Sequence, residues 1–232
     1  MARSRSIARP LVVFALAIGL LAVAAIDGAT VRGQAAEDSA TLSIGFGPSQ
    51  IWQPSQDAVR QLQMCTNQNY TCVRGIMEAD GASAGAIAFY RLTGWFLSDI
   101  EDHGPVDLGT IFTPWAANEN TQYALLGGIP AVIFPNQEAA TFGTALQHNA
   151  AYQAIASAHE DAMYWPFGPT VAGVETSPAG GPRFLFDYEV LNGCHACAIL
   201  AHVRLAFDFA ADGTEAGVQL VEVIPAPPPA EQ

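Results

Sequence analysis

The chain has 232 residues, of which 50% are hydrophobic and 13% charged, and its formal net charge is −13. This is the composition of a folded protein, and with nine arginines, no lysine and 22 acidic residues it excludes a surface for nucleic acid or anionic lipid. The sequence contains no phosphate-binding loop, dinucleotide glycine motif, zinc-protease helix motif or serine nucleophile elbow. Function therefore has to be sought in smaller groups of residues.

Residues 1–35 have the three parts of a secretory signal peptide. Three arginines precede an uninterrupted apolar run at residues 11–26, and Gly33 and Ala35 are the small residues that precede a cut. The apolar run is shorter than the roughly 20 residues that span a bilayer, which favours cleavage over a retained anchor. We expect a soluble, acidic periplasmic or secreted product with no stable membrane anchor, in which five arginines face 21 acids, a net charge of −16.

The remainder is interpreted as one α+β domain at residues 36–224, followed by a proline-rich disordered tail at residues 225–232. In this domain a helical N-terminal half packs on an antiparallel β-meander that ends in a disulfide-pinned hairpin. Apolar periodicity and turn residues predict, in chain order, a helix from Pro54 to Cys65, a helix after Ser83 that includes Trp95, strands at 106–113, 122–126 and 131–134, one or two helices at 139–162, a loop rich in proline and glycine up to Arg183, and strands at 184–190, 199–209 and 218–224.

Two registers are possible for the last hairpin, around Asn192-Gly193-Cys194-His195-Ala196-Cys197. In the first, Cys194 faces Cys197 and a disulfide closes the loop. In the second, Asn192-Gly193 forms the favoured two-residue turn and both cysteines fall on one strand, roughly 10 Å apart and too distant to bond. Side-chain pairing and oxidising export favour the first register, which predicts the cross-strand pairs Glu189–His202, Asp187–Arg204, Tyr188–Val203 and Phe186–Leu205.

Three interpretations of the C-x-x-C segment stay open. A structural disulfide Cys194–Cys197, with a second one between Cys65 and Cys72, is favoured by an oxidising compartment. A redox site would use Cys194 as attacking thiol, Cys197 as resolving thiol and His195 to tune acidity. Thioredoxin-like enzymes place that motif at the start of a helix, however, whereas residues 198–209 alternate as a strand. A metal site would add His195 and His202, but no second ligand pair recurs at zinc spacing, so we predict no metal and no cofactor.

Trp115, Asn118, Glu119 and Asn120 form a candidate binding loop between two predicted strands. Two amides that flank a carboxylate beside an indole can hydrogen-bond a small polar ligand or a sugar. The same residues are also typical of an ordinary turn without a binding role, because asparagine tolerates turn conformations.

Four segments together resemble a group of uncharacterised bacterial exported proteins: Gly104-Pro105-Val106-Asp107, Pro114-Trp115-Ala116-Ala117-Asn118-Glu119-Asn120, Trp165-Pro166 and Gly193-Cys194-His195-Ala196-Cys197-Ala198. The resemblance extends over most of residues 80–224. Members of the group often carry an arginine where Ala116 stands here, so an anionic ligand held by that arginine would lose its contact in this chain. The resemblance implies export and an intact fold, and it brings no activity with it.

No set of residues pairs a nucleophile with a base at a spacing that catalysis needs, so we lean against an enzyme. The hypothesis is a non-catalytic binding or accessory protein of the cell envelope, whose partner is a small polar ligand or an envelope protein and not nucleic acid. The alternative is a periplasmic thiol–disulfide oxidoreductase that uses Cys194 and Cys197.

Overall fold

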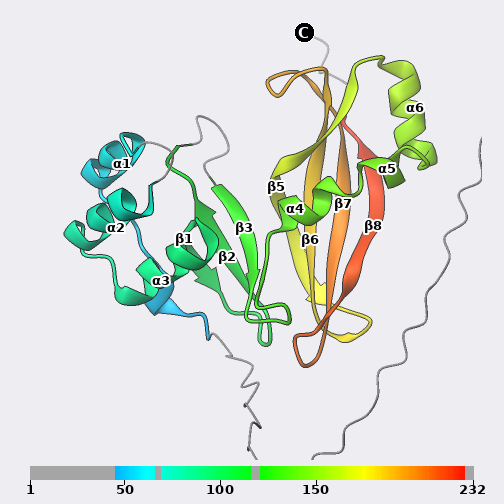
Figure 1. The fold of residues 1–232 in the computed structure, drawn as a ribbon. Coiled ribbons are helices and arrows are strands. Elements are labelled where there is room, and N and C mark those ends of the chain that lie inside the picture. Colours follow the sequence, from blue (N-terminus) through cyan, green and yellow to red (C-terminus); the bar gives the residue numbers. More distant parts are fainter. Residues whose placement is uncertain (1–44, 66–68, 116–120, 228–232) are drawn as a thin grey trace, which may run out of the picture. The chain divides into compact units, whose positions relative to one another are not determined.

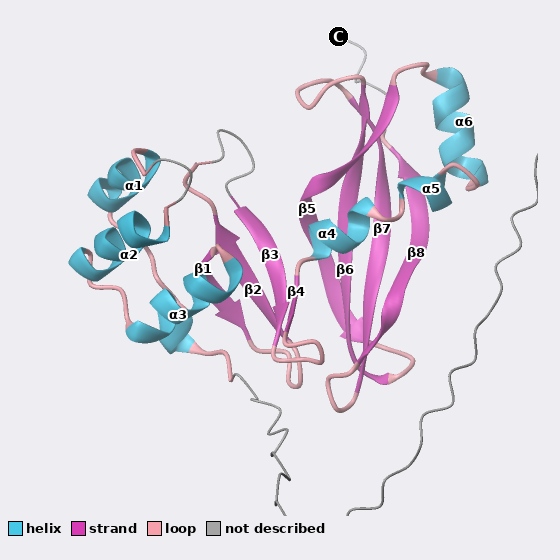
Figure 2. Ribbon diagram, in the orientation of Figure 1, coloured by secondary structure: helices cyan, strands magenta, loops and turns pink. Residues whose placement is uncertain are grey.

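Two antiparallel sheets organise the computed structural model, which describes residues 45–65, 69–115 and 121–227 (Figure 1). A short 3-10 turn and three helices precede the first sheet, and three more helices precede the second (Figure 2). The sheets have the strand orders β1-β2-β3-β4 and β5-β6-β7-β8. Helices come first and an antiparallel meander comes last, which confirms the predicted α+β class. The elements are η1 Pro48–Gln50, α1 Gln56–Gln63, α2 Tyr70–Ala79, α3 Ala84–Thr93, β1 Phe96–Glu101, β2 Asp107–Phe112, β3 Thr121–Leu126, β4 Val132–Ile133, α4 Pro135–Ala140, α5 Gly143–Leu146, α6 Ala150–Ala158, β5 Ala162–Thr176, β6 Gly180–Asn192, β7 Ile199–Ala210 and β8 Glu215–Pro225.

Serine side chains begin helices α1 and α3. The hydroxyl of Ser55 accepts a hydrogen bond from the Ala58 amide, and that of Ser83 accepts one from the Ala86 amide. Each hydroxyl thereby satisfies an amide that has no partner within its helix. Helix α3 ends at Gly94, whose φ of 77° lies in the left-handed region. Both helices agree with the sequence prediction, but Trp95 lies beyond this glycine and leads into β1, so its assignment to the second helix is wrong.

Helix α2 is missing from the sequence prediction. Its first amides, those of Thr71 and Cys72, donate to Oδ1 of Asn69 over 3.0 and 3.2 Å. Val73 and Met77, one helical turn apart, are both buried in a core cluster of the N-terminal helices. An asparagine cap followed by this apolar pair is the sequence signal that reveals the helix.

The long hairpin of β6 and β7 has the first of the two predicted registers. All four predicted cross-strand pairs are present, from Phe186–Leu205 to Glu189–His202. The apolar side chains of the two strands point to one face and are fully buried, since alternate residues of a strand share a face. Fully burying a large apolar side chain contributes roughly 1.5–3 kcal/mol, so this face is a main source of stability. Its residues are Phe184, Phe186, Tyr188, Val190, Ala201, Val203, Leu205 and Phe207.

The loop rich in proline and glycine that we predict before Arg183 is mostly strand β5, which pairs with β6. Trp165 faces Glu189 and the next registered residue, Thr170, faces Asp187, so the ladder is irregular at residues 166–169. Pro166 and Pro169 lie in this irregular stretch. Among the described strands β5 is at the edge of its sheet, and an edge strand tolerates proline because one side of its backbone needs no partner. Proline and glycine therefore mark a bulge here and not a loop.

The alanine-rich region at residues 139–162 forms parts of three short helices where we predict one or two. Helix α4 begins with Pro135 at its first position, four residues ahead of the predicted start. The chain turns at Phe142, and Asn149 then begins α6 by accepting hydrogen bonds from the amides of Ala151 and Tyr152. The helix-favouring composition is thus divided by turns and by this asparagine cap.

Backbone hydrogen bonds join the loop between β3 and β4 to the turn between β7 and β8. Ile129 donates from its amide to the Gly213 carbonyl and accepts at its own carbonyl from the Glu215 amide, each over 2.9 Å. Gly128 is required at this close approach, because a Cβ there would lie 2.7 Å from the Gly213 carbonyl oxygen. One core cluster accordingly contains Val106 and Leu108 together with the buried face of the second sheet.

Two predicted segments lie at the ends of the chain, the signal peptide and the proline-rich tail. The expected signal peptide, residues 1–35, lies outside the described residues. Strand β8 includes Pro225, and the Ala226 amide donates to the Leu200 carbonyl, so the predicted tail begins within the strand pairing. Residues 228–232 of that tail lie outside the described residues. Among the described residues no helix is long and apolar enough to cross a membrane.

Candidate functional site

A pocket of about 400 Å³ lies beside Trp115, the first residue of the predicted binding loop. We call it the aromatic pocket. It is formed where helix α3 ends and where strands β1, β2 and β3 lie next to one another. Its lining residues are Thr93, Gly94, Trp95, Phe96, Phe112, Thr113, Pro114, Trp115 and Gln122.

The aromatic walls rest on a packed group of rings. Phe96 is 2% exposed and stacks on Tyr90 with ring centres 4.8 Å apart. Trp115 meets Phe96 edge to face at 5.3 Å, and Trp52 meets it at 5.1 Å in the same geometry. These are favourable arrangements for aromatic pairs, so Trp115 is held by the core beneath it. Burial raises the pKa of Tyr90, a neighbour of the pocket, above its ordinary value.

The polar side chains of the pocket are few and mostly engaged. The Thr93 hydroxyl donates to the Phe89 carbonyl over 2.8 Å and accepts from the Trp95 amide. Gln122 accepts at Oε1 from Nδ2 of the buried Asn136 over 2.9 Å. Among the described residues the Gln122 Nε2 group has no other partner, so it is a donor that a ligand can use.

Charge is missing from the described lining of the aromatic pocket. None of its nine lining residues has an acidic, basic or thiol side chain. Thr93 and Thr113 are the hydroxyl-bearing residues, and no general base lies among the lining residues beside them. The arrangement can stack an apolar face of a ligand on aromatic rings and hydrogen-bond it at one side.

Only part of the predicted binding loop can be located. Trp115 lies in the aromatic pocket, as described above, and its ring is partly buried. Asn118, Glu119 and Asn120 lie outside the described residues, so their binding role stays a prediction. Trp95 and Gln122 are pocket residues that no sequence pattern indicates. They join Trp115 only because β1, β2 and β3 pair side by side.

The Cys194–Cys197 disulfide closes the turn between β6 and β7, with Cα atoms 5.1 Å apart. The Asn192 amide donates to the Ala198 carbonyl over 3.0 Å, so Asn192-Gly193 is part of a wider loop and not a two-residue turn. The second register, with both cysteines on one strand, is therefore wrong. Residues 199–210 form strand β7, as predicted, so no helix begins at the C-x-x-C segment to stabilise a thiolate.

The metal interpretation of the same segment has little structural basis. The two sulfur atoms are bonded to each other and are not thiolate ligands in this state. His202 faces Glu189 across the ladder, and the His195 ring lies 5.2 Å from the Trp165 ring. Within the described ranges no group of three or more histidine, cysteine, aspartate or glutamate side chains is gathered as a metal site would require.

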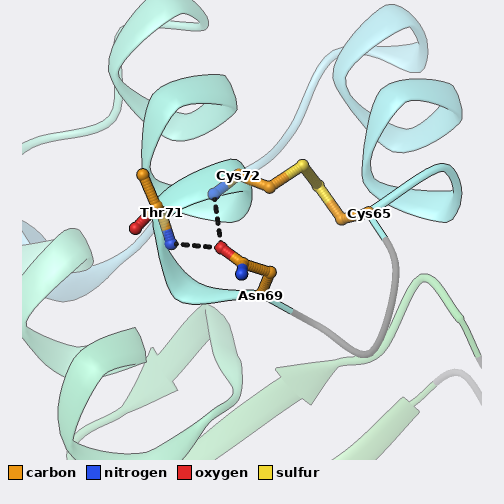
Figure 3. Close-up of a disulfide and its surroundings, with 4 residues drawn as sticks. All are labelled: Cys65, Asn69, Thr71 and Cys72. Carbon is orange, nitrogen blue, oxygen red and sulfur yellow. Dashed lines mark hydrogen bonds between the residues drawn. A yellow bond between two sulfur atoms is a disulfide. The ribbon is translucent and has the colours of Figure 1, made fainter.

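The second disulfide joins Cys65, just after α1, to Cys72 in the first turn of α2 (Figure 3). Its Cα atoms are 5.9 Å apart. Asn69 lies beside it and caps α2 through the hydrogen bonds to Thr71 and Cys72 that Figure 3 shows. The pairing agrees with the sequence prediction and ties two neighbouring helices together.

Fold and site thus define an α+β protein with two disulfides and an aromatic pocket whose described lining residues are uncharged. Comparisons with known protein families, with curated proteins and with solved structures found no match. The function has to be argued from the geometry of the chain itself.

Proposed function

We propose that this chain is a non-catalytic binding protein of the cell envelope, exported through its N-terminal signal peptide, that holds a small uncharged polar ligand in the aromatic pocket. The observation that carries the proposal is the described lining of the pocket: two tryptophans and two phenylalanines with threonine and glutamine, and no ionisable side chain among these described residues. Export is supported separately by the leader pattern and by two disulfides, which persist in oxidising compartments.

The ligand class follows from the chemistry of the walls. Aromatic rings offer apolar faces, and the Nε2 group of Gln122, which has no partner among the described residues, offers a hydrogen bond at one side. A sugar ring has this combination, with a C–H face and hydroxyl groups at its edge. The pocket volume of about 400 Å³ is in the range of pockets that enclose small ligands.

Electrostatics disfavour anions as ligands. The chain has a net charge of −13, and the described lining provides no arginine to compensate for it. An anion would lose its hydration without gaining an opposite charge. Neutral saccharides are therefore the first class to test.

The first prediction concerns tryptophan substitutions. We expect isothermal titration with a panel of neutral mono- and disaccharides to find one that binds, and Trp115→Ala and Trp95→Ala to weaken that binding at least about tenfold, which corresponds to about 1.4 kcal/mol. Trp165→Ala is the matched control, because Trp165 is a partly buried tryptophan outside the pocket lining. It should leave the affinity unchanged.

Folding has to be monitored in the same variants, since Trp115 packs on Phe96. If Trp115→Ala unfolds, Trp115→Phe keeps a ring on Phe96 while removing the indole. The proposal fails if no saccharide binds, or if the Trp165 variant loses affinity as much as the pocket variants do. Binding of choline in place of any sugar would overturn the ligand class, because aromatic walls also accept quaternary ammonium groups.

A further inference from the structure

We propose that the Cys194–Cys197 disulfide is a site of thiol–disulfide exchange with a protein dithiol, which docks on a partly exposed aromatic patch beside it. The patch consists of Trp165, Phe167 and His195. This inference is independent of ligand binding in the aromatic pocket, because the two sites share no residue.

Exposure is the first observation. Cys194, His195, Ala196 and Cys197 are all exposed at the end of the hairpin. Thiol–disulfide exchange requires a thiolate to approach a sulfur atom directly, and its rate depends on access. An incoming thiolate can reach this bond without any opening of the fold.

The hairpin does not depend on the bond for its pairing. The β6–β7 ladder is registered as far as Leu191–Ile199, and the Asn192 amide closes the loop on the Ala198 carbonyl. The Cys197 amide also donates to the Cys194 carbonyl. Cleavage of the disulfide therefore leaves the hydrogen bonds that hold the strands, and a bond between residues only three apart in sequence constrains little of the chain.

The Cys65–Cys72 bond is placed differently. Cys65 is partly buried and packs against the core cluster of the N-terminal helices, and Cys72 lies exposed in the first turn of α2. Reduction of this bond would release the connection between two helices that share a core. The Cys65–Cys72 bond therefore has one partly buried end and joins two helices, whereas both ends of the Cys194–Cys197 bond are exposed, and this second bond is the one that fits exchange.

The aromatic patch provides the docking surface. The Trp165 ring contacts Phe167 at 5.3 Å and His195 at 5.2 Å, and Phe167 is 40% exposed. Pro166 and Pro169 restrict the backbone of this part of β5, so the patch is presented without a large loss of entropy on binding. An exposed aromatic group next to a reactive bond suits a partner with an apolar segment around its own cysteines.

Charge determines which dithiol fits. Glu160 and Asp161 are exposed. Asp161 lies close to Gly193 in the hairpin loop, since a Cβ added to Gly193 would be 3.1 Å from the Asp161 Cβ. An acidic segment would be repelled here. The partner is thus a protein whose dithiol lies in an apolar segment that is neutral or basic.

The exchange balances as a transfer of two electrons and two protons. A thiolate of the partner attacks one sulfur of the pair, forms a mixed disulfide and releases the other cysteine, which takes up a proton. The second partner thiol loses its proton, attacks the mixed disulfide and releases the remaining cysteine, which is protonated in turn. The partner dithiol is oxidised to a disulfide, and the Cys194–Cys197 bond is reduced to two thiols.

The second prediction compares the two disulfides of the native protein. With dithiothreitol at neutral pH, differential alkylation followed by mass spectrometry should find Cys194 and Cys197 reduced at least tenfold faster than Cys65 and Cys72, with an unchanged circular dichroism spectrum. Equal rates for the two pairs, or reduction of Cys194–Cys197 only together with unfolding, would refute the proposal.

Docking is tested with a second reductant, a short synthetic peptide that carries a C-x-x-C dithiol between apolar and basic residues. Phe167→Ala should slow reduction by this peptide about tenfold, because the apolar contact is lost, and leave reduction by dithiothreitol unchanged. Leu92→Ala, which removes an exposed apolar side chain from α3, is the matched control and should leave both rates unchanged. An equal effect of Phe167→Ala on both reductants, or no effect on the peptide, would contradict the docking surface.

Discussion

Asp80 is the acidic side chain that organises the start of α1. Its carboxylate accepts hydrogen bonds from the Ser55 amide, the Ser55 hydroxyl and the Trp52 indole. These bonds favour the charged form, so the two bonds from Ser55, followed by the bond from Trp52, lower the pKa of Asp80 below its usual value of 3.8. A single residue thus connects the end of α2 to the cap of α1.

The third prediction is the pH dependence of this contact. A carboxylate whose pKa is lower in the folded state stabilises the fold above its unfolded pKa and ceases to do so as the pH falls through the folded pKa. Asp80→Asn should therefore reduce the free energy of unfolding at pH 7, and the difference from the wild type should shrink below a pH of about 3.8. Urea denaturation of both proteins at pH 7 and at a pH below about 3.8 measures the two differences in the free energy of unfolding.

Asp99→Asn is the control for that measurement, because Asp99 is exposed on β1. We expect it to change stability by less than about 0.5 kcal/mol at either pH. A difference between Asp80→Asn and the wild type that stays constant down to pH 2 would show that the charge of Asp80 plays no part.

The β6–β7 hairpin and strand β5 show what sequence patterns predict at the level of elements. Local alternation allowed two registers for the hairpin, and the opposite charges that face each other, as in the pair Asp187–Arg204, favoured the one that the structure has. Strand β5 could not be recognised in this way, because Pro166, Gly168 and Pro169 interrupt its alternation. Its strand conformation comes from hydrogen bonding to β6, which no local pattern records.

The fourth prediction tests the close packing at the start of β6. A Cβ at Gly181 would lie 2.2 Å from the carbonyl oxygen of Ala210 at the end of β7, so Gly181→Ala should force the two strands apart and destabilise the protein by about 1–3 kcal/mol. Gly75→Ala is the matched control, because a Cβ at this exposed position of α2 meets nothing within 4 Å.

Gly75→Ala should raise stability by about 0.5–1 kcal/mol, since alanine loses less backbone entropy than glycine in a helix. Thermal and urea unfolding of the two variants give both values. A neutral Gly181→Ala variant would mean that β6 and β7 are free to separate at this end.

On the scale of the whole molecule, the excess of acidic over basic residues is the main electrostatic feature. Four of the five arginines outside the predicted leader are paired with carboxylates, in the pairs Arg60–Asp57, Arg74–Glu78, Arg183–Asp208 and Arg204–Asp187. Arg183 and Arg204 each reach a second carboxylate, that of Glu175 or Glu222, yet most of the acidic residues that the structure describes pair with no arginine, and the mutual repulsion of the acidic side chains opposes the compact state.

The fifth prediction follows from this repulsion. Raising sodium chloride from about 0.01 M to 0.3 M shortens the range of electrostatic interactions from about 30 Å to below 10 Å, so the midpoint of thermal unfolding should rise. Potassium chloride at equal ionic strength should give the same rise. A midpoint that falls with salt would indicate that the ion pairs contribute more to stability than the repulsion removes.

The sequence by itself determined the features that depend on neighbours along the chain. The capped helices α1 and α3 follow from periodicity and turn residues, while side-chain pairing and cysteine spacing favoured the observed register of β6 and β7 and both disulfide pairings over their alternatives. The tertiary structure decided the aromatic pocket, where α3, β1, β2 and β3 bring Trp95, Trp115 and Gln122 together, and it decided that β5 is a strand. The physical reason is the same in both cases: these features are made by hydrogen bonds and contacts between segments distant in sequence, and a local pattern carries only the preferences of its own segment.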